Sequence, residues 1–337
     1  MTDTTDPIEY FLEDMAYHGR SERTRDAYDR VLHRFHDSLD AEKTLETVTH
    51  RDCLAWISTL RDEAAESTVA SYAAYLHRFY AYMNEVGMFD QNPMTLVMEE
   101  LDEQITTDPN RRDISVPEMG SFVQSVGHPL AKAVIVLLLK TGMRAGEACN
   151  LDLRDLSLGE TPIQTGPVRP QLEGRPNTIY VSNEPTRGAE HNGEIRKMSN
   201  KRKRETVIPI DEELQSVLVR WLAIRPDTPS PANPLFTSTE RNWGSRLTGN
   251  DVHHLVTSRA RDRGWYESGA GAGENVTPHY FRHFFTTHLR DRTGDRGIVK
   301  YLRGDVATDV IDTYTHNWGD RVREVYERNI YSLLDES

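Results

Sequence analysis

Apolar residues recur every three or four positions through most of the first hundred residues, which predicts a bundle of helices. The expected helices carry their apolar faces at Ile8–Met15, Tyr28–Phe35, Leu54–Leu60 and Tyr72–Met83. Their expected N-caps are polar residues that can accept a backbone hydrogen bond: Ser21, then Thr49 or Asp52, then Ser67 or Thr68. No alternation typical of a strand interrupts them. This part of the chain, residues 1–100, is therefore predicted to be a helical domain.

A polar stretch without periodicity, residues 101–114, is expected to be a linker. Ser115-Val116-Pro117-Glu118 then has the spacing of a capping box, with proline in the first turn, and is predicted to open a second domain over residues 115–337. The segment Ala131–Lys140 is apolar on nearly every side, so we expect it in the core of that domain.

Residues 160–200 are rich in Gly, Pro, Asn and Glu and indicate a long loop region. Two short strands are expected next to it, at Thr178–Ser182 and Thr206–Ile210. Helices are expected from Asp211 onward, interrupted by the glycine-rich stretch Gly264–Gly273. The pattern predicts a mainly α protein, whose C-terminal domain is mixed and carries a small β-sheet.

Charge is unevenly divided along the 337 residues. The formal net charge is −13, from 40 Lys and Arg against 53 Asp and Glu, and residues 1–105 alone carry 9 against 22. The rest of the chain is therefore balanced, and its basic residues can still form a positive patch for an anionic partner. Only seven residues are lysine, which suits either a protein of a salt-rich cytosol or an ordinary acidic protein.

Two cysteines, Cys53 and Cys149, lie far apart and form no CxxC pair, which excludes a disulfide framework and a cysteine-based zinc site. A reducing cytoplasm is the expected compartment. The longest apolar run, Ala133–Leu139, is far shorter than the roughly 18 residues that cross a bilayer. The acidic N-terminus does not resemble a secretory signal.

The segment Thr277–His283 carries the clearest candidate chemistry. Thr277 and Pro278 are typical of a helix start, which places His279 and Arg282 on one face of the first turn. Free N–H groups, an imidazole and a guanidinium can together hold a phosphate, although an ordinary exposed arginine remains the alternative. A metal site at His283 and His288 is disfavoured, because no carboxylate pattern accompanies them.

Three further segments are ambiguous when each is taken alone. Arg144 follows an apolar helix and needs an anionic partner, either Glu147 or a ligand. The basic run Lys201–Arg204 indicates a solvated hairpin tip or a lysine that reaches a phosphate. Tyr314 stands among small polar residues and off any apolar face, as most surface tyrosines do.

Taken in order, these segments resemble the tyrosine recombinase family, the phage-type integrases. The order is TGMRAGE, a lysine beside a strand ending in VIPI, HYFRHFFTTHL, and a Gly-Asp pair nine residues before a tyrosine. The resemblance spans the whole chain, because the N-terminal helices look like the family's SAM-like core-binding domain. It implies five catalytic residues: Arg144, Lys201, His279, Arg282 and Tyr314.

The sequence departs from the family at one catalytic position. Asp305 stands where the family has histidine or tryptophan, and an ionised carboxylate cannot donate a hydrogen bond to a phosphate. Either Asp305 orients another catalytic group, or His316 or Trp318 takes over the donation. Lys203 also remains an alternative to Lys201.

The resemblance implies a site-specific recombinase that cuts and rejoins double-stranded DNA through a 3′-phosphotyrosyl bond. It implies no cofactor and no metal, a homo-tetramer on synapsed DNA that is compatible with a free monomer, and a cytoplasmic, nucleoid-associated protein. Two alternatives stay open: a type IB topoisomerase-like enzyme, and a catalytically impaired DNA-binding relative.

The C-terminal tail carries one apolar stripe at helical spacing, formed by Val322, Val325, Tyr326 and Ile330. Such a stripe must be buried against another surface. It could pack on its own domain, but the resemblance favours packing on a neighbouring protomer.

Overall fold

The computed structural model describes residues 6–103, 111–163, 166–271, 273–305 and 318–334, with only the backbone described at 318–320. The chain divides into two compact units, residues 1–110 with 269–271, and the remaining residues from Arg111 to the C-terminus. Each unit is treated by itself below. The predicted bounds of the two domains and the linker stay predictions.

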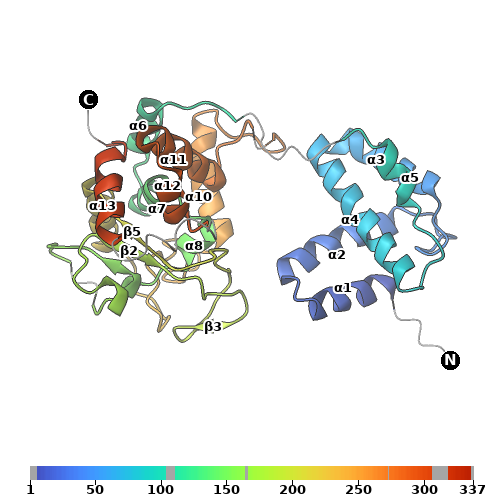
Figure 1. The fold of residues 1–337 in the computed structure, drawn as a ribbon, viewed down its shortest axis with the longest axis horizontal. Helices are drawn as coiled ribbons and strands as arrows, with labels where there is room; N and C mark the ends of the chain where they lie inside the picture. Colours follow the sequence, from blue (N-terminus) through green and yellow to red (C-terminus); the bar gives the residue numbers. More distant parts are fainter. Residues whose placement is uncertain (1–5, 104–110, 164–165, 272, 306–317, 335–337) are drawn as a thin grey trace. The chain divides into compact units, whose positions relative to one another are not determined.

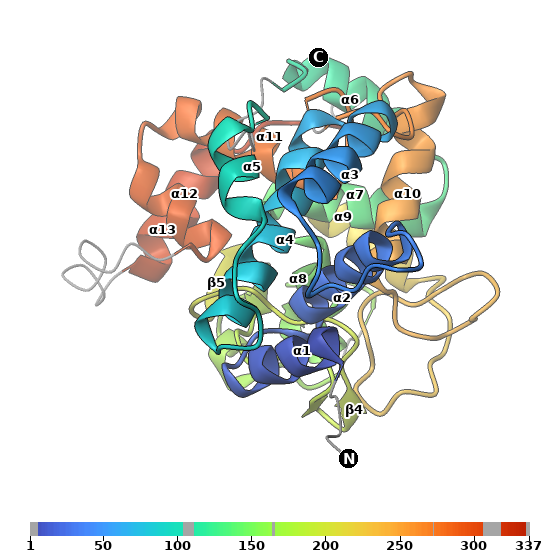
Figure 2. The ribbon, with the colours of Figure 1, turned by 90° about the vertical axis from the view of Figure 1, so that its right-hand side faces the viewer.

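The first unit is the predicted helical bundle (Figures 1 and 2). Its helices are α1 (Pro7–Tyr17), α2 (Glu22–Asp37), α3 (His50–Glu63), α4 (Glu66–Glu85) and α5 (Met94–Glu100). The side chain of Ser21 accepts the backbone N–H of Thr24 at 3.2 Å and so caps α2 as expected. The short helix α5 was not predicted from the sequence.

Helix α4 forms the centre of this bundle and contacts each of the other four helices. Its buried face consists of apolar residues at the predicted spacing, including Leu76, Phe79 and Met83. Phe79 also packs edge-to-face on Phe11 of α1. The periodicity of α4 therefore identifies one side of the core of the first unit, and buried residues of the other helices complete that core.

The second unit is mainly helical, as predicted. It contains α6 (Val116–Ser125), α7 (Pro129–Thr141), α8 (Ala145–Cys149), α9 (Glu212–Leu222), α10 (Gly249–Asp262), α11 (Pro278–Thr293), α12 (Arg296–Arg303) and α13 (Trp318–Asn329). Ser115 and Glu118 form the expected capping box of α6. The apolar helix α7 is buried along nearly its whole length and packs against α6, α8, α9, α10 and α11. None of the described helices is both long and apolar enough to cross a bilayer.

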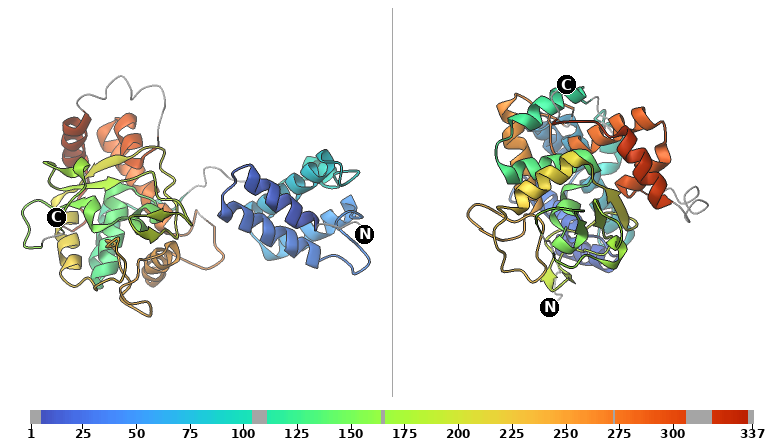
Figure 3. Two further views of the ribbon diagram at one scale, coloured as in Figure 1. Left: turned by 90° about the horizontal axis from the view of Figure 1, so that it is seen from below. Right: turned by 90° about the vertical axis from the view of Figure 1, so that its left-hand side faces the viewer.

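A small antiparallel sheet lies beside these helices (Figure 3). Its strands are β1 (Leu156–Ser157), β2 (Thr178–Val181) and β5 (Thr206–Pro209), in the order β1-β2-β5 with Ile179 opposite Ile208. The two expected strands are thus confirmed. The sequence did not predict β1, nor the hairpin of β3 (Glu190–His191) and β4 (Glu194–Ile195), because two-residue strands show no periodicity.

The C-terminal stripe packs on its own domain, so the expectation that it docks on a neighbouring protomer is wrong for this structure. Val322 and Tyr326 of α13 are buried against α11 and β5. The hydroxyl of Tyr326 donates to the carbonyl of Lys140 at 3.0 Å, and the backbone N–H of Leu333 donates to the carboxylate of Glu213. The apolar surface for this tail thus comes from α11 and β5, and its hydrogen-bond acceptors come from the end of α7 and from Glu213 of α9.

Candidate active site

A tight turn after α7 positions Arg144. Gly142 ends α7 with φ of +62°, and a Cβ atom there would lie 2.3 Å from the ring of Phe285. Only glycine accepts both conditions at low cost. Arg144 is consequently the N-cap residue of α8, and its guanidinium is held at 3.0 Å by Glu147 one turn later. The pairing of Arg144 with Glu147 is as the sequence indicated.

Glu147 is completely buried and also binds Arg202, so this one residue of the basic run Lys201–Arg204 is not solvated. The Nη2 atom of Arg202 lies 3.1 Å from Glu147, and its Nη1 atom donates to the carbonyl of Leu302 at 3.1 Å. Burial lowers the pKa of Arg202, while Glu147 opposes that shift. Arg202 thus joins α8 to the end of α12 from behind the site.

Lys201 and Lys203, on either side of Arg202, are both exposed. The backbone N–H of Lys203 points at the carbonyl of Gly304, 3.4 Å away, so this segment runs along the end of α12. Among the described residues, neither lysine side chain has a hydrogen-bond acceptor or an ion-pair partner. The choice between the two lysines stays open.

Arg282, on the first turn of α11, forms the floor of the site and is only 3% exposed. Its Nη1 atom donates to the carbonyl of Gly142 at 2.7 Å, and both Nη atoms reach the carbonyl of Arg303 at 3.2 Å. Burial, followed by the positive charge of Arg144, lowers the pKa of Arg282 to about 10. Arg282 nevertheless stays charged at neutral pH.

Asp305 brings the arginines together. Its Oδ1 atom lies 3.1 Å from Nη2 of Arg144 and 2.8 Å from Nη2 of Arg282, and its Oδ2 atom lies 2.8 Å from Nη2 of Arg303. Burial favours the neutral acid, but the guanidiniums outweigh burial and lower the pKa of Asp305. Asp305 is therefore an ionised acceptor in this structure.

Gly304 makes the approach to Asp305 possible. It ends α12 with φ of +69°, and a Cβ atom there would lie 2.4 Å from Cγ of Arg202. The chain can therefore turn sharply over the buried Arg202 and present Asp305 to the arginines only because residue 304 has no side chain.

His279 lies at the mouth of the site with an exposed side chain. Partial removal from water lowers the pKa of the imidazole, and nearby positive charges lower it further; they belong to Arg111, Arg282, Arg144 and Arg303. At neutral pH His279 is therefore a neutral imidazole that can accept a proton.

We expect the His279 imidazole of the free protein to titrate with a midpoint below 6.5. Proton NMR of the ring C–H signals across pH tests this, with the signal assigned by its loss in His279→Gln. Inorganic phosphate should raise the midpoint, because an anion among the arginines offsets their charge. A midpoint at or above 6.5 without phosphate would contradict the lowered pKa.

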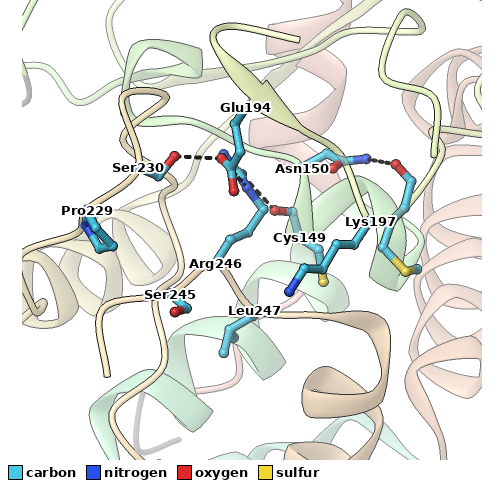
Figure 4. A pocket seen from close by; sticks show the side chains of 10 residues that line it. Cys149, Asn150, Glu194, Lys197, Pro229, Ser230, Ser245, Arg246 and Leu247 are labelled. Carbon is cyan, nitrogen blue, oxygen red and sulfur yellow. Dashed lines mark hydrogen bonds and ion pairs between the residues drawn. The ribbon is translucent and has the colours of Figure 1, made fainter. Parts of the chain in front are cut away.

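A buried ionic network anchors the other end of α8 (Figure 4). The Nη1 atom of Arg246 donates to the carbonyl of Cys149 at 2.9 Å, and its Nη2 atom contacts both Asp152 and Glu194 at 2.6 Å. Arg196 also pairs with Asp152, at 2.8 Å. A cavity of about 220 Å³ lies beside this network. The helix that starts at the candidate site is thus fixed at both ends.

Tyr314 and His316 lie outside the described residues, so their predicted roles stay predictions, as does any role for Trp318. The structure does bring together Arg144, His279, Arg282 and Asp305, which come from three separate segments.

Sequence reasoning missed three arginines around the site. Arg202 looked like one of four equivalent basic residues, and nothing in that run shows which side chain points inward. Arg303 directly precedes Gly304-Asp305, but many surface helices end in a basic residue. Arg111 lies within the predicted linker. No sequence signal distinguishes any of the three from solvated arginines.

The charge of the site favours an anion. The named groups include five guanidiniums and two carboxylates, an excess of three positive charges: Arg111, Arg144, Arg202, Arg282 and Arg303 against Glu147 and Asp305. Arg144, Arg303 and Asp305 each keep about a third of the side chain exposed, at 32%, 28% and 32%. Within the described ranges, no three His, Cys, Asp or Glu residues are grouped to hold a metal ion. The site fits a phosphate group that arrives from solvent.

Three related proteins align with this chain over nearly its full length. The chain is 24% identical to the tyrosine recombinase XerC of Thermodesulfovibrio yellowstonii, covering 98% of this chain and 97% of that protein. It is 25% identical to the tyrosine recombinase XerD of Listeria innocua (97% and 98% covered). It is 24% identical to the tyrosine recombinase XerA of Pyrococcus horikoshii (96% and 93%).

Solved structures share the fold. The Tn1549 transposon integrase in complex with a circular intermediate DNA matches with a TM-score of 0.65 at 19% identity, over 96% of this chain and 99% of that one. A lambda integrase tetramer bound to a Holliday junction matches with a TM-score of 0.62 at 14% identity, over 90% and 78%. The mainly α fold with a small sheet is thereby confirmed.

Two family models match, one described as the phage integrase N-terminal SAM-like domain over residues 8–85 and one as the phage integrase family over residues 125–319. The second spans more than half of the chain and includes every predicted catalytic residue. With the site and the relatives described above, this match shows that the chain belongs to the phage integrase family of tyrosine recombinases.

Proposed function

We propose that this recombinase cleaves and rejoins double-stranded DNA at specific sites through a 3′-phosphotyrosyl intermediate. The observation that carries the proposal is the group of partly exposed guanidiniums with excess positive charge around Asp305 and His279. A phosphodiester is the anion on which the relatives named above, as recombinases and integrases, act.

In the proposed reaction, the hydroxyl of Tyr314 attacks a backbone phosphorus, and the 5′-oxygen of the next nucleotide leaves. The neutral imidazole of His279 accepts the proton of Tyr314, and Lys201 or Lys203 supplies the proton that the 5′-oxygen needs. Arg144 and Arg282 stabilise negative charge on the non-bridging oxygens. In the DNA-free arrangement Arg282 donates to Asp305, which fixes the position of its guanidinium in the site.

The guanidiniums supply the charge neutralisation, and the phosphotyrosyl bond conserves the energy for rejoining, so the proposal needs neither a metal nor a nucleotide. We further propose that four copies assemble on two synapsed sites and that the free chain can be a monomer. The lambda integrase tetramer on a Holliday junction supports this assembly. Action on chromosomal DNA would place the protein in the cytoplasm, at the nucleoid.

Trapping on nicked DNA tests the proposal. A library of random-sequence duplexes, each with a nick close to the cleavage position, is incubated with the full chain and EDTA. Cleavage then releases a short fragment, so rejoining cannot occur and the chain stays covalently attached. Sequencing the attached DNA gives the target site. We expect an SDS-resistant adduct with a 3′ linkage and a free 5′-hydroxyl.

The other outcomes separate the alternatives. Relaxation of supercoiled plasmid without strand exchange between two captured sites would indicate topoisomerase-like activity. Specific DNA binding without any adduct would indicate a catalytically impaired relative. An adduct that forms only when a divalent metal is added would contradict metal independence.

A further inference from the structure

The position of Asp305 leaves the site with one donor fewer than its family pattern implies. Asp305 has a lowered pKa and accepts hydrogen bonds from Arg144 and Arg282, so it is ionised and cannot donate to a phosphate. Arg303, two residues before Asp305, is a candidate for the missing donor. Arg303 lies 2.8 Å from Asp305 and faces the same partly exposed mouth as Arg144.

The main chain of Arg303 is fixed by the floor of the site. Its carbonyl oxygen accepts hydrogen bonds from both Nη atoms of Arg282, each at 3.2 Å. Its side chain, by contrast, is 28% exposed to solvent. The Nε–H group of Arg303 is buried and has no acceptor among the described residues. A buried donor without an acceptor is unfavourable, and an oxygen of a bound phosphate would supply the missing acceptor.

We propose that Arg303 is a third phosphate-binding guanidinium of the reaction and that Asp305 is the residue that positions it. This inference rests on the proposed function. Asp305 binds Nη2 of Arg303 through Oδ2 while its Oδ1 binds Arg144 and Arg282, so one carboxylate sets the spacing of three guanidiniums. Without it, three like charges would repel one another at close range.

The charge of this group matches the transition state better than the substrate. Arg144, Arg282 and Arg303 with Asp305 carry a net charge of +2. A phosphodiester carries one negative charge, and the five-coordinate phosphorus of the transition state carries about two. Interactions that strengthen between these states raise the rate of the chemical step. An additional guanidinium at the phosphate therefore favours the transition state over the substrate.

The test compares Arg303→Ala with the wild type in single-turnover cleavage of the duplex captured by the wild type. We expect a loss of about 10²–10³-fold in rate, as for removal of one oxyanion donor, with nearly unchanged DNA affinity. Arg290→Ala is the matched control, because Arg290 is an exposed arginine of α11 that pairs with Asp291. The control should cleave at the wild-type rate.

A second substrate separates phosphate binding from a structural role. In a methylphosphonate, a methyl group replaces one non-bridging oxygen and removes the negative charge. If Arg303 neutralises that charge, Arg303→Ala should lose much less rate on the methylphosphonate than on the phosphodiester. Equal losses on both substrates would overturn the inference, because a distorted site would slow both reactions alike.

Two further variants test the charge of Arg303 and the positioning role of Asp305. Arg303→Lys keeps the charge and should retain more activity than Arg303→Ala, and thermal unfolding should show both variants folded. Asp305→Asn should slow cleavage, and combining it with Arg303→Ala should cost little more than either change alone, since both act through one group. Fully additive losses would contradict the positioning role.

If the wild type forms no adduct, the proposed function itself fails. If the wild type and Arg303→Ala react equally, only this inference fails.

Discussion

Replacing Tyr314 with phenylalanine will abolish covalent attachment to DNA and leave DNA binding largely intact. The change removes a single oxygen, the nucleophile of the proposed reaction, and keeps the aromatic ring. Tyr314 stands nine residues after Asp305, at the spacing that the family resemblance assigns to the nucleophile. The measurement is the yield of SDS-resistant adduct on the nicked duplex, together with a gel-shift titration of the same duplex. The adduct should fall below detection.

Tyr326 provides the matched control. Both Tyr326 and Tyr331 are fully buried, and their hydroxyls donate to the carbonyls of Lys140 and Leu139 in the core of the second unit. Burial, and then nearby acidic groups, raises the pKa of each phenol well above its ordinary value, so neither is a ready nucleophile. Tyr326→Phe should form adduct at the wild-type yield and lose about 1 kcal/mol of stability. Peptide mapping of the wild-type adduct to Tyr326 or Tyr331 would refute the assignment.

Asp152→Ala will destabilise the second unit by about 3–5 kcal/mol. The carboxylate of Asp152 is completely buried and binds Arg196 at 2.8 Å and Arg246 at 2.6 Å. Both guanidiniums are nearly excluded from water, so removal of Asp152 leaves buried charge without its main partner. Because Arg246 also holds the carbonyl of Cys149, the loss would reach the helix that carries Arg144. Equilibrium urea unfolding of the full chain measures the change.

Asp291→Ala is the control for that experiment, because the Asp291 side chain is 59% exposed and pairs with Arg290 at the surface. We expect its free energy of unfolding to change by about 1 kcal/mol at most.

Burial opposes ionisation of Asp152, but the two arginines outweigh the effect of burial and lower the pKa of Asp152. The stabilisation is therefore present above the ordinary carboxyl pKa and is lost as the pH falls through the lowered one. A cost of less than 1 kcal/mol for Asp152→Ala would show that the network relaxes easily.

The spacing of apolar residues and the capping residues in the sequence determined the helices and where they begin. Ser21 and the Ser115–Glu118 box cap helices where the sequence indicated, because capping depends on residues only three positions apart. The spacing in α4 likewise identified the core of the first unit, and the apolar run in α7 identified the centre of the second. The order of motifs was enough to select Arg144, His279 and Arg282, which the fold does bring together.

Tertiary structure alone decided which charged groups meet. Arg202 binds the buried Glu147, and Arg303 binds Asp305. From the sequence alone, both arginines would be expected to lie in solvent. The stripe of α13 packs on its own domain because α11 and β5 cover it and the carbonyl of Lys140, at the end of α7, accepts a hydrogen bond from Tyr326. These outcomes depend on partners that lie 55 to 186 positions apart in the chain, except for Arg303 and Asp305. Periodicity reports which face of a helix is apolar, whereas the partner of a buried charge is set by the packing of distant segments.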